Sequence, residues 1–141
     1  MCDAVALDAT HDEETLLLER GSRCFVIMNK YPYNNGHVLI APMQHEGDLA
    51  ALDDETMAEL GRLTQRWIRV LRAAMRAQGF NVGYNLGEVA GAGVADHVHG
   101  HVVPRWGGDA NFMSVVADCR VVSQSLTEAW HLLREAASRL P

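Results

Sequence analysis

The spacing of hydrophobic and polar positions changes along the chain and separates helical from extended segments. From Asp53 onward, apolar residues recur at intervals of three and four with charged residues between them, which predicts one long amphipathic helix. Asp53 or Asp54 is suited to cap its start, and Gly79 stands where a C-terminal cap belongs. The tail from about Ser125 to Leu140 has the same periodicity and predicts a second helix.

Shorter β-rich runs between turn signals predict strands. They cover residues 15–20, 23–29, 36–42, 80–86 and 97–103, and the first two flank a turn at Gly21-Ser22. Strands that follow one another in an antiparallel-looking succession around one long helix indicate an α+β fold, with an antiparallel sheet of about five strands. Because no repeat or linker interrupts the pattern, we expect a single domain over residues 1–141.

Composition narrows the class of protein. Of 141 residues, 48% are hydrophobic, enough for a real core, but no run is long enough to span a membrane and no signal segment is evident. Cys2, Cys24 and Cys119 form an odd, scattered set, so we expect a reducing, cytoplasmic location. The net charge of −6 argues against nucleic acid as a partner but leaves room for a small phosphorylated ligand at a local anion site.

The segment "DHVHGHVVPRW" places histidines at every second position, at His97, His99 and His101. On an extended strand these side chains leave on one face, and alternating imidazoles are not a packing solution. A metal site fits poorly, because the outer pair would lie roughly 13 Å apart at about 3.3 Å per residue. Purely structural histidines are a second alternative. Nucleophilic catalysis, with one neutral imidazole attacking phosphorus, is the interpretation we favour.

The same residues resemble the histidine triad (HIT) family of nucleotide hydrolases and transferases. "HVHGHVV" matches that family's pattern of histidines alternating with apolar residues, and "NKYPYNNGHVLIAPMQH" upstream has the family's order and spacing. The resemblance covers about residues 15 to 122. Within the family, the chain is similar to the bacterial branch of diadenosine polyphosphate phosphorylases and hydrolases. It implies a HIT-like fold and an enzyme that acts on the α-phosphate without a cofactor or metal.

The resemblance also implies roles for the histidines. His99, the middle member of the triad, would be the nucleophile that forms a nucleotidyl-histidine. His101 would contact phosphate oxygens near the scissile bond, and His97 would support the site from behind. His37 matches the family's fourth active-site histidine. The attacking nitrogen is free only if the ring's other nitrogen holds the proton, which a nearby backbone carbonyl can ensure.

Substrate-binding residues follow from the same resemblance. Asn29 corresponds to the residue that binds the ribose hydroxyls, and an amide suits a diol because it both accepts and donates. Ile27 and Leu39 match positions that line the nucleobase pocket, which favours purines weakly. Asn85 matches an amide near the phosphates, and Gly93, in the Gly91–Gly93 loop, can bring backbone N–H groups close to phosphate.

The chain departs from the family pattern at several positions. Many relatives carry a hydroxyl or amide side chain where this chain has Gly93 and Val94, so the proton for the leaving group must come from His101 or water. Gly100 replaces an apolar residue of the triad pattern, and we expect a neighbour to pack against it.

Zinc and distal-phosphate roles are a separate question. Some relatives hold a structural zinc through an N-terminal Cys-x-x-Cys, but here the second thiolate is missing after Cys2, so we predict no zinc and a loop-anchoring or surface role for His45. For Arg105 and Trp106 we leave two alternatives open, contact of Arg105 with distal phosphates or a solvated arginine beside a packed tryptophan.

The leading hypothesis is an enzyme that cleaves an adenylyl group from a dinucleoside polyphosphate through a covalent histidine intermediate. An adenosine phosphoramidase and a nucleotide-binding regulatory protein with little turnover are the alternatives, and a three-histidine metal hydrolase is a distant one. The expected partners are a small purine nucleotide and, by resemblance, a second copy of the chain in a homodimer formed through the long helix and a strand.

Overall fold

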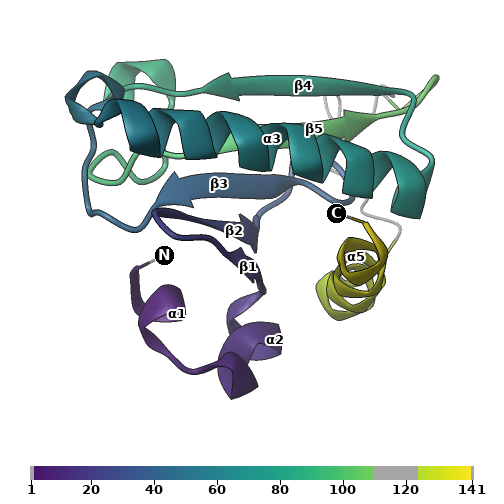
Figure 1. Ribbon diagram of the computed structural model, residues 1–141. Coiled ribbons are helices and arrows are strands. Elements are labelled where there is room, and N and C mark those ends of the chain that lie inside the picture. The colour runs from purple at the N-terminus through teal and green to yellow at the C-terminus, as the bar shows by residue number, and fades with distance from the viewer. Residues whose placement is uncertain (1, 110–123, 141) are drawn as a thin grey trace.

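The structure, a computed structural model, describes residues 2–109 and 124–140. Five strands form a single sheet, with helices on both sides of it (Figure 1). The strands are β1 (Leu17–Arg20), β2 (Cys24–Met28), β3 (Val38–Pro42), β4 (Gly79–Tyr84) and β5 (Gly100–Arg105). The helices are α1 (Cys2–Ala6), α2 (Asp12–Thr15), α3 (Asp54–Met75) and α5 (Leu126–Arg139), with short 3₁₀ turns at Ala9–His11, Leu49–Ala51 and Glu88–Ala90.

The sheet has the order β1-β2-β3-β5-β4, and every neighbouring pair is antiparallel. In its centre, Ile27 of β2 is opposite Leu39 of β3, and Leu39 is opposite His101 of β5. The predicted α+β fold, with a five-stranded antiparallel sheet, one long helix and a C-terminal helix, is confirmed.

The two long helices start where the sequence predicts but the first ends earlier. The Asp53 carboxylate caps α3 by accepting the Thr56 backbone N–H at 2.7 Å. Ser125 caps α5 through a reciprocal pair of hydrogen bonds with Glu128. The prediction that Gly79 caps α3 is wrong: the helix ends at Met75, Arg76 takes the left-handed conformation with φ 53°, and Gly79 already begins β4.

Strand alternation divides the buried side chains between the two faces of the sheet. Val26, Val38 and Val102 belong to the main core with residues of α3 and α5, which cover one face (Figure 1). Residues one position along the strands form a smaller cluster on the opposite face, near α1 and α2: Ala4, Leu17, Phe25, Ile27, Leu39 and Ala41. Leu39 is opposite His101, so the histidine segment reaches this second face.

The histidine segment is extended over a shorter range than the predicted strand 97–103. Strand β5 begins at Gly100, so His97 and His99 precede it. The pairing with β3 stops at Ile40, and Pro42, at the end of β3, has no N–H to offer a partner strand. The Val98 N–H instead donates to the Glu46 carbonyl at 2.7 Å. The alternation survives nevertheless, because Val98 is buried in the main core and His97 contacts Phe25 on the other face.

Gly100 has the close neighbour that the sequence analysis expects. A Cβ atom at this position would lie 3.0–3.2 Å from the phenol group of Tyr84, its partner on β4. The glycine therefore makes room for the tyrosine ring.

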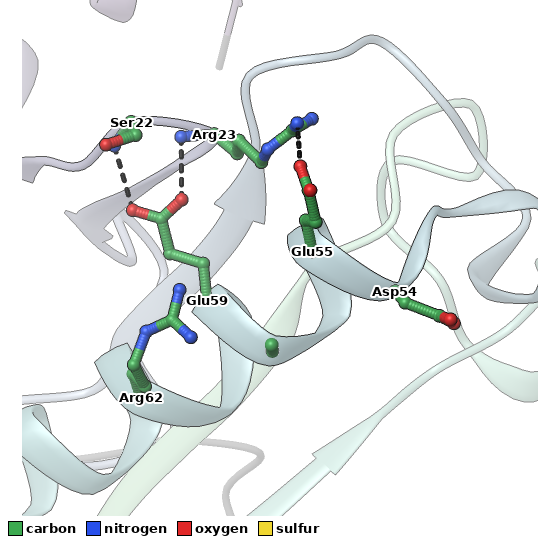
Figure 2. A pocket seen from close by; sticks show the side chains of 7 residues that line it. Ser22, Arg23, Asp54, Glu55, Glu59 and Arg62 are labelled. Carbon is green, nitrogen blue, oxygen red and sulfur yellow. Dashed lines mark hydrogen bonds and ion pairs between the residues drawn. The ribbon is translucent and has the colours of Figure 1, made fainter.

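Helix α3 is also tied to the turn between β1 and β2. Figure 2 shows the Glu59 carboxylate reaching from α3 to this turn, where it accepts the backbone N–H groups of Ser22 and Arg23 at 2.8 and 2.7 Å. Arg23 in turn pairs with Glu55. These residues border a hollow of about 400 Å³, where Arg23, Glu55 and Glu59 join the helix to the turn.

Two further predictions bear on the environment of the chain. Among the described residues, no helix is both long and apolar enough to cross a bilayer. Cys24 is a buried free thiol, and burial raises its pKa to about 12. Cys119 and the side chain of Cys2 lie outside the described part of the chain.

Candidate active site

A cavity of about 1120 Å³ opens beside the histidine segment. Six of the residues predicted for the site line it: Ile27, Asn29, Leu39, Gly93, His99 and His101. The other three, His37, His97 and Asn85, lie outside its lining. The residues that the sequence analysis gathers from four separate segments are thus brought together by the sheet register.

His99 has the hydrogen-bonding arrangement of a nucleophile. Its Nδ1 lies 2.8 Å from the backbone carbonyl of His97. A carbonyl only accepts, so Nδ1 carries a proton, and in the neutral imidazole Nε2 keeps its lone pair. Nε2 forms no hydrogen bond to any described residue, and the side chain is only 6% exposed at the cavity wall. In the neutral ring this nitrogen is therefore available to a ligand in the cavity.

His37 and His101 form a second, linked pair whose proton positions are also determined. The Tyr33 backbone N–H donates to Nδ1 of His37 at 3.1 Å, so this nitrogen is an acceptor and the ring proton is on Nε2. That Nε2–H lies 3.0 Å from Nδ1 of His101 and donates to it. His101 must then carry its own proton on Nε2.

The Nε2–H of His101 is a buried donor without an acceptor among the described residues. A buried donor left unpaired costs about 1–3 kcal/mol, so this N–H in the cavity wall is suited to donate to a ligand. Its ring lies 4.9 Å from that of His99. Burial lowers the pKa of His101, and the neighbouring His99 adds to this effect, so His101 is a neutral donor. The site combines a bare lone pair on one ring with a free N–H on the next.

His97 supports this arrangement from behind. It is 1% exposed, and its Nε2 donates to the Pro42 carbonyl at 2.8 Å. Burial lowers its pKa, with the hydrogen bond to Pro42 opposing the shift. Its own carbonyl accepts the Nδ1 proton of His99, so the position of His97 sets that of the His99 ring.

Asn29 links the cavity to the histidine pair. Its side-chain oxygen accepts the Tyr31 N–H at 2.9 Å, and its Nδ2 lies 3.2 Å from Nδ1 of His37. The first contact fixes the orientation of the amide, and one amide hydrogen and one lone pair remain for a ligand. This geometry is compatible with binding a ribose diol.

Of the two predicted phosphate-binding residues, Gly93 lines the cavity and Asn85 does not. Gly93 lines the cavity, and its backbone N–H makes no hydrogen bond to a described residue. Asn85 instead directs its Nδ2 to the Gly91 carbonyl at 3.5 Å, a long contact on the loop itself. The structure therefore places Asn85 against the loop and away from the cavity lining.

Arg105 and Trp106 follow the structural alternative. The Arg105 guanidinium forms a two-point pair with the Asp109 carboxylate, both bonds being 2.7 Å, and also donates to Asn81. The same pair holds the pKa of Asp109 well below its usual range. Trp106 donates to the Met75 carbonyl, and neither residue lines the cavity.

Several residues at the cavity are absent from the sequence-based list. Tyr33 stacks on His101, with ring centroids 5.7 Å apart and planes 14° from parallel. Lys30 and Tyr31 also line the cavity, as do residues from the N-terminal segment and the start of α5. The sequence could have identified the two tyrosines, because the aromatic residues of "NKYPYNN" lie between the predicted site residues Asn29 and His37.

Comparison with known proteins identifies the family. The family model of the HIT domain matches residues 11–108. The chain is 45% identical over 130 residues to the AP-4-A phosphorylase of Mycobacterium tuberculosis H37Rv, covering 92% of this chain and 67% of that protein. The chain belongs to the HIT family. The assignment made from the histidine pattern is confirmed.

Other HIT relatives differ in what their names record. A zinc-bound histidine triad family protein from Mycobacterium smegmatis matches with a TM-score of 0.79 at 30% identity, covering 98% of this chain and 91% of that one. The adenosine 5'-monophosphoramidase of Schizosaccharomyces pombe is 32% identical over 74 residues, 52% of each chain.

The zinc-bound relative prompts the question of whether this HIT chain could hold such an ion. Within residues 2–109 and 124–140, no three His, Cys, Asp or Glu side chains are arranged to bind a metal. His97 and His45 are neighbours, with ring centroids 5.0 Å apart, but Nε2 of His97 already donates to Pro42. The described residues do not fit a zinc site, and the metal-free expectation stays a prediction.

Proposed function

We propose that this HIT protein transfers an adenylyl group from a dinucleoside polyphosphate through a covalent intermediate on His99. The observation that carries the proposal is the pair formed by the bare Nε2 of His99 and the unpaired Nε2–H of His101. A nucleophile needs the first and a departing phosphate oxygen needs the second. A HIT-type enzyme that acts on nucleotides agrees with the phosphorylase among its relatives.

In the first step, the lone pair on Nε2 of His99 attacks the α-phosphorus. A phosphorus–nitrogen bond forms as the bond to the bridging oxygen breaks, and that oxygen leaves with the rest of the polyphosphate. His101 donates its Nε2–H to this oxygen or to a neighbouring one, so the leaving group is stabilised as its charge grows. The amides of the Gly91–Gly93 loop would hold the remaining oxygens.

In the second step, phosphate or water attacks the same phosphorus and His99 leaves with its electron pair restored. With phosphate as the acceptor, diadenosine tetraphosphate yields ATP and ADP; with water, it yields ATP and AMP. Asn29 would bind the ribose, and Ile27 and Leu39 would contact a purine base through apolar area. We favour phosphate because the relative that matches over 92% of this chain is a phosphorylase.

An adenosine phosphoramidase is the second candidate. The S. pombe relative of that name supports it, although the match covers only 52% of this chain. A phosphoramidate has a small amine as its leaving group and needs no room beyond the nucleotide. The cavity of about 1120 Å³ favours the larger substrate.

The test is a substrate panel with wild type, His99→Ala and a matched His11→Ala control. His11 is outside the cavity lining, and its side chain forms no capping hydrogen bond to α2. We expect wild type to cleave diadenosine tetraphosphate, His11→Ala to match it, and His99→Ala to lose turnover while still binding AMP. Wild type quenched in alkaline denaturant, where a phosphorus–nitrogen bond to histidine is stable, should carry the mass of one adenylyl group.

The same panel separates the alternatives. Turnover by His99→Ala, or loss of turnover after exhaustive chelation, would contradict the covalent histidine mechanism. Wild-type binding of AMP with no cleavage of any substrate would support the regulatory alternative. Omitting inorganic phosphate reveals which acceptor resolves the intermediate.

We further propose a cytoplasmic homodimer of one domain over residues 1–141. Among residues 2–109 and 124–140, β4 is an edge strand that pairs with β5, and its outer edge is suited to pair with a second copy. Val82 on this strand is 50% exposed and Met57 on α3 is 37% exposed, which suits an apolar two-fold contact. Sedimentation equilibrium would measure the mass, and a monomer at micromolar concentration would contradict the dimer.

A further inference from the structure

The cavity is larger than one nucleotide requires. Its volume of about 1120 Å³ exceeds the roughly 300–1,000 Å³ of a typical ligand pocket. The wall formed by Ile27, Leu39 and Asn29 accounts for a base and a ribose. The segment Lys30–Tyr33 directly follows Asn29 and lines the cavity without an assigned role.

Tyr33 brings this segment to the reacting centre. Its ring stacks on His101 and lies 4.7 Å from the ring of His37, while its backbone N–H sets the His37 proton position. The segment is therefore fixed beside the N–H that would face the leaving group.

Tyr31 is the most exposed tyrosine of this wall. Tyr31 is 78% exposed, although its backbone N–H donates to the side-chain oxygen of Asn29 at 2.9 Å. An anchored backbone with an exposed aromatic ring at a cavity mouth provides a stacking surface at low ordering cost. Any nucleobase has a face that can stack on such a ring.

Charge distinguishes this wall from the rest of the cavity. The acidic lining residues, Glu13 and Glu14, come from the α2 segment, and Lys30 is the lysine among the described lining residues. A polyphosphate is repelled by the two glutamates and attracted by Lys30. The exit past Lys30 is thus the favourable one for a departing chain of phosphates.

We propose that Lys30 and Tyr31 form a subsite for the leaving half of the substrate, with Lys30 binding the distal phosphates and Tyr31 stacking on the second nucleobase. This inference rests on the proposed function, because it assigns the part of the dinucleotide that His99 does not retain. It makes the segment a determinant of specificity for dinucleotides over mononucleotides.

The test compares three substrates that differ only in the leaving group. Diadenosine tetraphosphate has both phosphates and a second base, adenosine tetraphosphate has phosphates alone, and adenosine phosphoramidate has neither. Tyr31→Ala should lower kcat/KM about 5- to 10-fold for the first substrate only, since one stacked base is lost. Tyr31→Phe keeps the ring and should behave as wild type. Lys30→Gln should lower kcat/KM for both polyphosphate substrates and leave kcat/KM for the phosphoramidate unchanged.

Two outcomes would overturn the subsite while leaving the proposed function intact. One is wild-type cleavage of the dinucleotide with Tyr31→Ala affecting all three substrates equally. The other is no effect of Tyr31→Ala or Lys30→Gln on any of them. If wild type cleaves nothing, the proposed function fails, and the subsite is decided by binding. In that case, calorimetry should show that Tyr31→Ala lowers the affinity for diadenosine tetraphosphate but not that for adenosine tetraphosphate. Equal affinities of wild type and Tyr31→Ala for diadenosine tetraphosphate would refute the subsite.

Discussion

The link between His37 and His101 gives the most informative perturbation of the site. His37 is fully buried, accepts hydrogen bonds from Tyr33 and Asn29, and donates to Nδ1 of His101. Replacing it with leucine keeps a similar volume and removes all three hydrogen bonds. At about 1 kcal/mol each, the loss is roughly 3 kcal/mol of folding free energy, less than the 5–15 kcal/mol that a domain usually has. The variant should therefore fold.

The effect on turnover should exceed what this stability loss suggests. As the Nε2 proton of neutral His101 moves toward a negatively charged phosphate oxygen, negative charge develops on the His101 ring. The Nε2–H of His37, which donates to Nδ1 of His101, stabilises that charge. A hydrogen bond to a charged group contributes about 1.5–3 kcal/mol. At 1.36 kcal/mol per tenfold, kcat should fall about 10- to 100-fold in His37→Leu, with a smaller change in KM.

Steady-state kinetics with diadenosine tetraphosphate measures this effect, and thermal unfolding confirms that the variant is folded. The matched variant is His37→Gln, whose amide offers one acceptor and one donor as the histidine does. It should recover most of the lost kcat. A folded His37→Leu protein with kcat within twofold of wild type would refute the reasoning, as would equal losses in the leucine and glutamine variants.

Two further predictions concern the fold around the site. Gly100→Ala should lower the free energy of unfolding by about 1 kcal/mol, because crowding against the Tyr84 ring, typically 1–3 kcal/mol, outweighs the 0.4–1 kcal/mol gained by restricting the unfolded chain; urea denaturation measures it, and a stabilised variant would contradict the close contact. Burial lowers the pKa values of His97 and His101, so below about pH 6.5 the unfolded chain binds protons that the folded chain resists, and stability should fall as the pH drops from 7 toward 5. Melting temperatures across that range test this, and a flat profile would show that these rings do not resist protonation.

Much of the fold follows from the sequence because local periodicity and caps act over short distances. The three-and-four spacing after Asp53 places the long helix, and the side chain of Asp53 caps it as expected. Alternation along the histidine segment puts Val98 in the core and His97 on the other face, although the regular strand begins only at Gly100. That start depends on Pro42 at the end of the neighbouring strand, which no local pattern in the histidine segment reveals.

The sequence also predicts residues that the structure brings to one cavity, but it does not give the protonation of their rings. His99, His101, Asn29, Ile27 and Leu39 were all identified from their motifs and all line one cavity. A motif names residue types; it does not say which nitrogen of an imidazole holds the proton.

For His37 and His101, only the tertiary structure decides that, because the two residues are far apart in the chain. His37 and His101 are separated by 64 residues and meet through the register of β3 with β5. At two other positions, hydrogen-bond partners that the motifs do not name decide the role of the side chain. Arg105 is held by Asp109 and Asn81, and Asn85 lies against its own loop instead of the cavity. Periodicity selects the face on which a side chain emerges, whereas hydrogen bonds between distant segments decide what that side chain is free to do.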